Sequence, residues 1–315
     1  MGLRVSGTVR TVVIGAVNWD VNFFVKRFPH KGEEAIVERV TRVPGGKAGN
    51  TVVAAARLLG PAHAAIIGGL GKDSIGAEQV KIFEGEGVVT SGLKFFDLES
   101  GQAYIAIDSN GANMIYKLSG ANALITPKDL DDPVRSALIS EAAVVAIMDP
   151  PFETGIRMAE KAKGLGKIVA WDPGVNSELG LENVRPLMKN LDYLVANEHE
   201  AANLAGARNP IAAAKKLAAS NRGLKAVVKL GGRGCVMLGG GRKEVLPKLD
   251  MSALGLKVVN TVGCGDAFLG AFVSALSEGL SDLDALRWGN CAVGLKATRY
   301  ETRGSPTREM ILKYL

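Results

Sequence analysis

The feature that most constrains the fold of this chain is an alternation of short apolar runs with segments of helical character. The apolar runs, typical of buried parallel strands, lie at residues 11–15, 64–67, 143–147, 168–171, 193–196 and 226–230. The helical segments lie at residues 50–59, 75–86, 152–163 and 211–219. Strands separated by helices of this length build a mostly parallel sheet covered by helices on both faces. The sequence therefore predicts an α/β fold, and because no internal repeat or linker interrupts it, we expect one domain over residues 1–315.

Two stretches break this alternation, at about residues 34–43 and 102–118. Both have the character of strands without crossover helices, and the second contains a good hairpin turn at residues 108–111. They predict a small antiparallel sheet outside the main one; a surface β-meander is the alternative. Both arms of the hairpin are largely apolar, so we expect a second copy of the chain to cover them in a homodimer.

Composition and charge exclude several classes of function. The net charge of +6 comes from scattered lysines and arginines, and no basic run is interleaved with aromatics, so nucleic acid is not an expected partner. A basic balance does suit anionic ligands such as nucleotides. The apolar stretches are far shorter than a bilayer span, and no signal-peptide pattern opens the chain. Three widely spaced cysteines indicate a reducing compartment, so we expect a cytoplasmic protein without a membrane partner or a cysteine-based metal site.

Residues 260–268 form a glycine-rich turn that runs into an apolar helical pattern. Gly263 and Gly265 allow a tight bend and leave amide N–H groups uncovered. The helix that follows directs its N-terminus at the same place, which suits an anion such as a transferring phosphate. Asp266 stands in this turn. It is either a helix cap or a carboxylate that takes a proton from an attacking hydroxyl.

Further polar residues lie beside strand ends and glycine turns. Asp20 follows the first apolar run, where open α/β sheets bind ligands, and is either a loop residue or a partner for sugar hydroxyls. Asn50 follows a glycine turn as an N-cap or a hydroxyl ligand. Asn197 and Glu200 have the N-x-x-E spacing of a capping box. Residues 229–234 form a glycine turn that is either a plain hairpin or a set of bare amides near phosphates.

The residues 263–266, Gly-Cys-Gly-Asp, resemble the GAGD signature of the PfkB/ribokinase family of carbohydrate kinases. Four other segments resemble family motifs in the same order, at residues 18–20, 45–50, 197–200 and 229–234. The resemblance covers nearly the whole chain, and five motifs in order are specific for the family but not for the substrate. It implies a ribokinase-like fold in which the small sheet forms a lid over the sugar site.

The resemblance also implies an ATP-dependent kinase acting on a primary hydroxyl of a pentose-like sugar, with Mg²⁺ on the nucleotide phosphates. Asp266 would take the hydroxyl proton. The backbone N–H groups that would hold the phosphoryl group belong to Gly263, Cys264 and Gly265. The implied substrate residues are Asn18, Asp20, Gly46, Lys47 and Asn50. The implied ATP-binding residues are Asn197, Lys229, Gly231, Gly234 and Asn290, and Glu200 with Asn197 would order water on the magnesium.

The acceptor stays open. The substrate residues resemble the ribose-type pattern, whereas Asp172-Pro173-Gly174 and His199-Glu200 are similar to features of archaeal nucleoside kinases of the family. A sugar phosphate, met by Lys47 and Lys117, is a third alternative, and a non-catalytic sensor of sugar or nucleotide is a fourth.

The position of Asn260 bears on a second cofactor. Many relatives carry Asp there, and the resemblance implies that this Asp helps to bind a monovalent cation. Asn brings no negative charge, so we expect only a weak dependence on K⁺.

Overall fold

The centre of the molecule is a nine-stranded sheet with the order β13-β12-β11-β10-β9-β8-β1-β4-β5. The structure is a computed structural model that describes residues 8–315. The strands are β1 (Thr11–Gly15), β4 (Ala64–Gly71), β5 (Leu93–Phe96), β8 (Val144–Met148), β9 (Ile168–Asp172), β10 (Tyr193–Asn197), β11 (Lys225–Lys229), β12 (Cys235–Gly239) and β13 (Arg242–Leu246). Neighbours from β5 to β11 pair in parallel, and β12 and β13 extend one edge antiparallel. The predicted mostly parallel sheet is confirmed.

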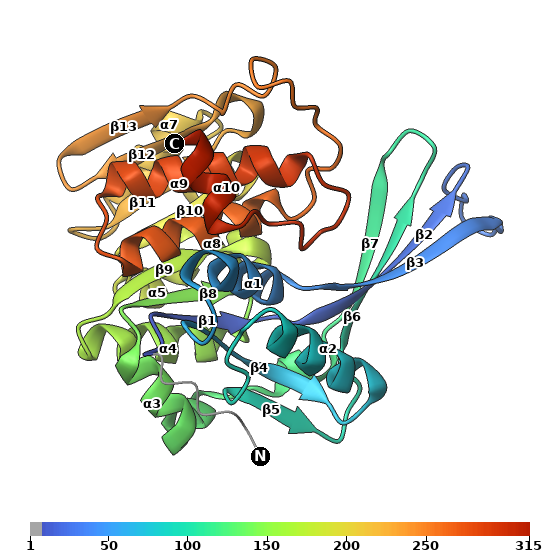
Figure 1. The fold of residues 1–315 in the computed structure, drawn as a ribbon, viewed down its shortest axis with the longest axis horizontal. Coiled ribbons are helices and arrows are strands. Elements are labelled where there is room, and N and C mark those ends of the chain that lie inside the picture. Colours follow the sequence, from blue (N-terminus) through green and yellow to red (C-terminus); the bar gives the residue numbers. More distant parts are fainter. Residues whose placement is uncertain (1–7) are drawn as a thin grey trace.

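Helices cover both faces of this sheet (Figure 1). One face carries α1 (Lys47–Leu59), α2 (Ser74–Gly85), α8 (Cys264–Ser277), α9 (Asp282–Ala297) and α10 (Arg308–Tyr314). The other carries α3 (Pro133–Glu141), α4 (Phe152–Gly164), α5 (Gly180–Met188), α6 (Glu198–Ala205) and α7 (Pro210–Ala218). Side chains of a strand alternate between the two faces, so Val13 packs in the first core and its neighbours Val12 and Ile14 pack in the second.

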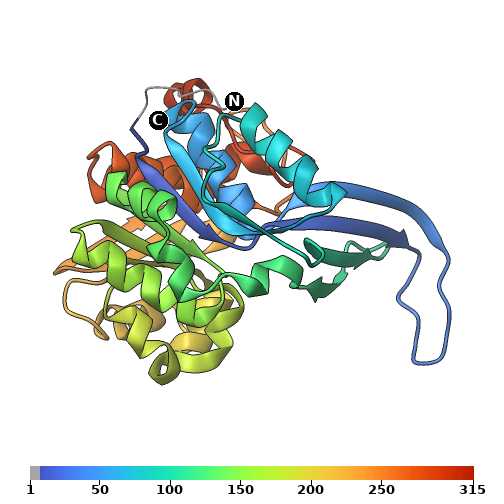
Figure 2. The ribbon, with the colours of Figure 1, turned by 90° about the horizontal axis from the view of Figure 1, so that it is seen from below.

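A four-stranded sheet with the order β3-β2-β6-β7 projects from one side of the body (Figure 2). We call it the lid. Its strands are β2 (Asn18–Val25), β3 (Val37–Gly45), β6 (Gly101–Ile107) and β7 (Asn113–Leu118). The outer pairs are antiparallel, as expected, but the central pair of β2 and β6 is parallel. Asp20 lies within β2, so it is not the loop residue that the sequence left open as one alternative.

Short 3-10 helices complete the chain at Gly120–Leu124, Pro127–Asp131, Gly174–Leu179 and Gly231–Arg233. The hairpin turn between β6 and β7 forms as predicted, with the Gly111 N–H donating to the Asp108 carbonyl at 3.0 Å. Large apolar side chains stay exposed on the lid, at Ile36, Val37, Val40, Met114, Ile115 and Tyr116. Among residues 8–315, no helix is both long and apolar enough to cross a membrane.

Candidate active site

A cavity of about 670 Å³ lies where the carboxyl ends of the central strands meet the lid and the start of α8. Parallel strands β9, β10 and β11 end at Asp172, Asn197 and Lys229, and all three residues line it. This edge is the usual ligand site of an open α/β sheet. Every residue that the sequence reading placed in the substrate, phosphate, nucleotide and magnesium sites also lines this cavity. The fold therefore brings together five motifs that are up to about 250 residues apart.

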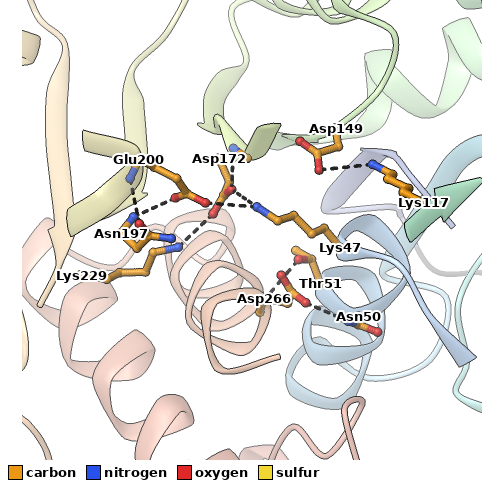
Figure 3. A network of polar contacts seen from close by, with 11 residues as sticks. Lys47, Asn50, Thr51, Lys117, Asp149, Asp172, Asn197, Glu200, Lys229 and Asp266 are labelled. Atoms are coloured by element: carbon orange, nitrogen blue, oxygen red, sulfur yellow. Dashed lines mark hydrogen bonds and ion pairs between the residues drawn. The ribbon is translucent and has the colours of Figure 1, made fainter. Parts of the chain in front are cut away.

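Asp266 lines the cavity between its lid end and its Lys229 end, in the first turn of α8. The helix begins after Gly263, which has a positive φ of 81°, and a side chain at that position would collide with the carbonyl oxygen of Thr302. Asn50 Nδ2 donates to Asp266 Oδ2 at 2.8 Å from the first turns of α1 (Figure 3). Burial raises the pKa of Asp266 to about 6, against the attraction of Lys47. A carboxylate in this state is ionised at neutral pH and close to the optimum for accepting a proton.

The amides of the glycine turn are not equivalent. The N–H of Cys264 donates to the carbonyl of Thr261 at 3.2 Å. The N–H of Gly265 has no backbone acceptor within residues 8–315, and the space beside its α-carbon is bordered by Lys229 Nζ. An anion at this helix start would therefore meet the Gly265 amide and the Lys229 ammonium together.

A charged cluster spans the floor of the cavity (Figure 3). The buried Asp172 accepts from Lys47 Nζ at 2.8 Å and from Lys229 Nζ at 2.9 Å. Burial opposes its ionisation, but the two ammonium groups outweigh this and lower its pKa. Burial likewise opposes the charge on Lys47, and Asp172, Asp149 and Glu200 raise the pKa of Lys47 well above its usual value. Asp172 and Lys47 are thus both charged, and the two ion pairs hold Lys47 and Lys229 toward the cavity.

Asn197 and Glu200 form the capping box of α6, with Asn197 Oδ1 accepting from the Glu200 N–H at 2.9 Å and Glu200 Oε2 accepting from the Asn197 N–H at 2.8 Å. Glu200 Oε1 faces Lys47 Nζ at 3.3 Å. Burial and the neighbouring Asp172 raise the pKa of Glu200. Residues 8–315 contain no cluster of three or more side chains suited to enclose a metal. One carboxylate oxygen facing the cavity does fit Mg²⁺ that is held by phosphates and water.

Two acidic residues, Asp20 and Asp149, lie at the lid end of the cavity, and the sequence motifs indicated only Asp20. Burial raises the pKa of Asp20 to about 6, and the nearby Arg303 partly offsets this. Arg303 itself donates to Asn50 Oδ1 at 3.1 Å and was not predicted. Asp149 follows β8 with a positive φ of 55° and a buried Oδ1 that has no hydrogen-bond partner. Lys117 reaches from β7 to within 3.8 Å of Asp149 Oδ2. An unpaired buried oxygen in a strained backbone is a mark of a binding position.

Two predicted residues use their side chains within the protein. Asn18 lines the cavity, but its Oδ1 accepts from Asn122 Nδ2 at 2.9 Å. Asn290 Nδ2 donates to the Pro247 carbonyl at 2.9 Å, beside a second, smaller cavity. Arg233, in the glycine turn at residues 229–234, is exposed and pairs with Glu198. Asn18 and Asn290 therefore border the site while also fixing loops around it.

Comparison with known proteins places this architecture in a family. The model for the pfkB family carbohydrate kinases matches residues 10–308. A ribokinase of Lactococcus lactis is 32% identical over 293 residues, which cover 93% of this chain and 92% of the relative. An ATP-dependent ribose-1-phosphate kinase of Halopiger xanaduensis is 29% identical over 313 residues, covering 98% of each chain. The solved structure of an Arabidopsis thaliana ribokinase complexed with ribose and ATP has a TM-score of 0.84 at 25% identity, and the match covers 98% of this chain and 99% of that one. The chain belongs to the pfkB family of carbohydrate kinases, and its fold is ribokinase-like.

Proposed function

We propose that this protein is an ATP-dependent kinase that transfers the γ-phosphate to a primary hydroxyl of a pentose-like sugar. Its family and its ribokinase relatives support an ATP-dependent phosphotransferase acting on a pentose or a nucleoside. The single observation that carries the proposal is the placement of Asp266. Its buried carboxylate stands at the helix start between the lid end and the Lys229 end of one cavity. The acceptor hydroxyl and the γ-phosphate would meet between these two ends, and the proposed reaction needs a base at that place.

In the proposed reaction, the acceptor hydroxyl lies against Asp266 and its proton passes to the carboxylate. The hydroxyl oxygen forms a bond to the γ-phosphorus while the bond to the bridging oxygen of ATP breaks, which releases ADP. The Gly265 amide and Lys229 offset the negative charge of the transferring group. Asn50 fixes the carboxylate through its 2.8 Å hydrogen bond. Positioning and electrostatics thus supply most of the rate.

The proposed acceptor subsite comprises Asp20, Asn50, Gly46, Asn18 and Asp149 beneath the lid. The carboxylates of Asp20 and Asp149 are acceptors for sugar hydroxyls, and both residues line the lid end of the cavity. The proposed nucleotide subsite comprises Asn197, Glu200, Lys229, Gly231, Gly234 and Asn290. Magnesium, held by the phosphates and by water that Glu200 orders, would neutralise phosphate charge there.

ATP consumption over a panel of acceptors tests the proposal. ADP release should be measured with pentoses, hexoses, nucleosides and their monophosphates, each paired with a thermal-shift measurement. We expect turnover with ribose or a close relative, and loss of turnover without loss of ATP binding in Asp266→Asn. Stabilisation by a sugar or nucleotide without ADP release from any acceptor would instead show a non-catalytic sensor.

A sugar phosphate is the second candidate, because Lys117 extends from the lid into the acceptor end of the cavity. Lys117 and Lys47 both line the cavity and could meet such a phosphate. The relative from Halopiger xanaduensis is a ribose-1-phosphate kinase by name. A nucleoside is favoured by a different feature, the apolar Ile105, Ile115 and Val175 that line the same cavity and suit a base. The acceptor panel separates these candidates directly.

A further inference from the structure

Lys296 is a buried lysine that the proposed reaction does not use. It lies in the last turn of α9 and is among the largest fully buried side chains of the molecule. Its Nζ donates to the backbone carbonyl of Asn260 at 3.0 Å. A buried ammonium is costly unless its charge has a counterpart. An aliphatic side chain would fill this buried place at a lower free-energy cost, so the presence of a charge here needs an explanation.

The ammonium of Lys296 lies behind the glycine turn that begins α8. The turn is joined to α9 by the N–H groups of Val259 and Asn260, which donate to the Ala297 carbonyl at 2.7 and 3.1 Å. Cys264 Sγ is 3.7 Å from the Val293 carbonyl on the same helix. Burial lowers the pKa of Lys296, and the nearby Cys264, Glu301 and Asp266 oppose this. The positive charge therefore acts on the turn that would hold the phosphoryl group.

The same place does not fit a dissociable monovalent cation. Asn260 Oδ1 accepts from the Val262 N–H at 3.0 Å, and Asn260 Nδ2 donates to the Tyr300 carbonyl at 2.7 Å. The backbone oxygen of Asn260 accepts from Lys296. Each oxygen of Asn260 is thus engaged within the protein, no carboxylate stands at this position, and a resident ammonium is already present. A second cation beside it would meet like charge.

We propose that Lys296 is a built-in monovalent cation, a positioning residue whose fixed charge stabilises the phosphoryl-binding turn and makes activity independent of K⁺. The kinetic part of this inference rests on the proposed kinase function. The charge of Lys296 acts through the turn rather than by touching the substrate. It offsets negative charge that builds near Gly265 and Asp266 during transfer.

The test compares Lys296→Met, which keeps the length and removes the charge, with Lys296→Arg, which keeps the charge. Lys257→Met, at an exposed lysine near the turn, is the control. With K⁺ replaced by tetramethylammonium at constant ionic strength, wild-type turnover should change less than about two-fold. Lys296→Met should lower kcat at least about ten-fold with little change in the KM for ATP, because the charge acts on the transition state. Lys296→Arg should retain more turnover than Lys296→Met.

Cys264 gives a readout that needs no turnover. Burial raises the pKa of its thiol, and Lys296 lowers it. Removing the positive charge should therefore move the pH profile of Cys264 alkylation, followed by peptide mass mapping, to higher pH in Lys296→Met alone. The other two cysteines are buried, so Cys264 is the accessible reporter. An unchanged Cys264 profile in Lys296→Met, or a ten-fold K⁺ activation of the wild type, would overturn the inference. A shifted Cys264 profile in a protein that phosphorylates no acceptor would refute the kinase proposal alone.

Discussion

Replacing Asp266 by Asn should slow catalysis by orders of magnitude and stabilise the fold at the same time. Burial raises the pKa of Asp266 from its ordinary value of 3.8 to about 6. One pKa unit corresponds to about 1.4 kcal/mol, so keeping this carboxylate charged costs the folded state up to about 3 kcal/mol at neutral pH. This free-energy cost already includes the attraction between Asp266 and Lys47. Asn removes the charge and keeps an oxygen that can accept the hydrogen bond from Asn50.

The sign of the pH dependence follows from the raised pKa. The folded state binds the proton more tightly than the unfolded chain, so the penalty is full above about pH 6 and absent below pH 3.8. The stability gained by Asp266→Asn should therefore be up to about 3 kcal/mol near pH 7.5 and only about 1 kcal/mol near pH 4.5. In the same variant, kcat should fall about 10²- to 10⁴-fold relative to the wild type, which is the usual contribution of a general base.

Urea denaturation at the two pH values and a coupled assay of ADP release measure both effects. Asp97→Asn is the control, because the Asp97 side chain is 86% exposed and its replacement should change stability by less than about 0.5 kcal/mol. Near-wild-type turnover of Asp266→Asn would refute its role as the base. An unchanged free energy of unfolding near pH 7.5 would refute the argument from burial.

Three further outcomes follow from the same geometry. Turnover of the wild type should drop about ten-fold between pH 7 and pH 5, because Asp266 becomes protonated at about pH 6; a flat profile would exclude it as the titrating base. If the acceptor is a sugar phosphate, Lys117→Met should raise its KM about 10- to 100-fold while sparing free ribose, whereas equal effects on both would remove Lys117 from phosphate binding. Sedimentation at micromolar concentration should show a dimer that Ile115→Asp in the exposed lid disrupts; a wild-type monomer would contradict a lid interface.

Most of the main fold could be predicted because its strands and helices are indicated by patterns of neighbouring residues. Apolar runs of strand length recur between helices of crossover length, and nearly each expected element lies within a few residues of its observed bounds. The strand β2 was missed because its sequence, Asn-Trp-Asp-Val-Asn-Phe-Phe-Val, begins with polar residues that read as a loop. Its strand geometry depends on pairing with β6, whose partner residues lie about 80 positions away. Tertiary contacts of that range leave no local pattern.

The glycine turn before α8 and the capping box of α6 were predictable for a similar reason. Glycine turns, helix starts and capping boxes are defined by neighbouring residues, so the sequence indicates where backbone amides are bare. The residues missed act through side chains in three dimensions. Asp149 stands before two prolines and resembles a turn residue in sequence, yet it has a positive φ, a buried oxygen without a hydrogen-bond partner and a place in the lining of the cavity. Arg303 lies near the C-terminus and meets Asn50 across 253 positions.

Opposite charges from distant parts of the chain meet in one cavity. Lys47 follows Gly46 at the acceptor end, while its ammonium contacts Asp172 and Glu200 toward the nucleotide end. Lys229 contacts the same Asp172 from the other side. A phosphate that approached Lys229 or Lys47 would compete with Asp172 for the same ammonium groups, so binding at either end must alter the charge felt at the other. We therefore expect the two proposed subsites to be electrostatically linked through one buried carboxylate, so a substitution of Asp172 should affect the KM values of ATP and acceptor together.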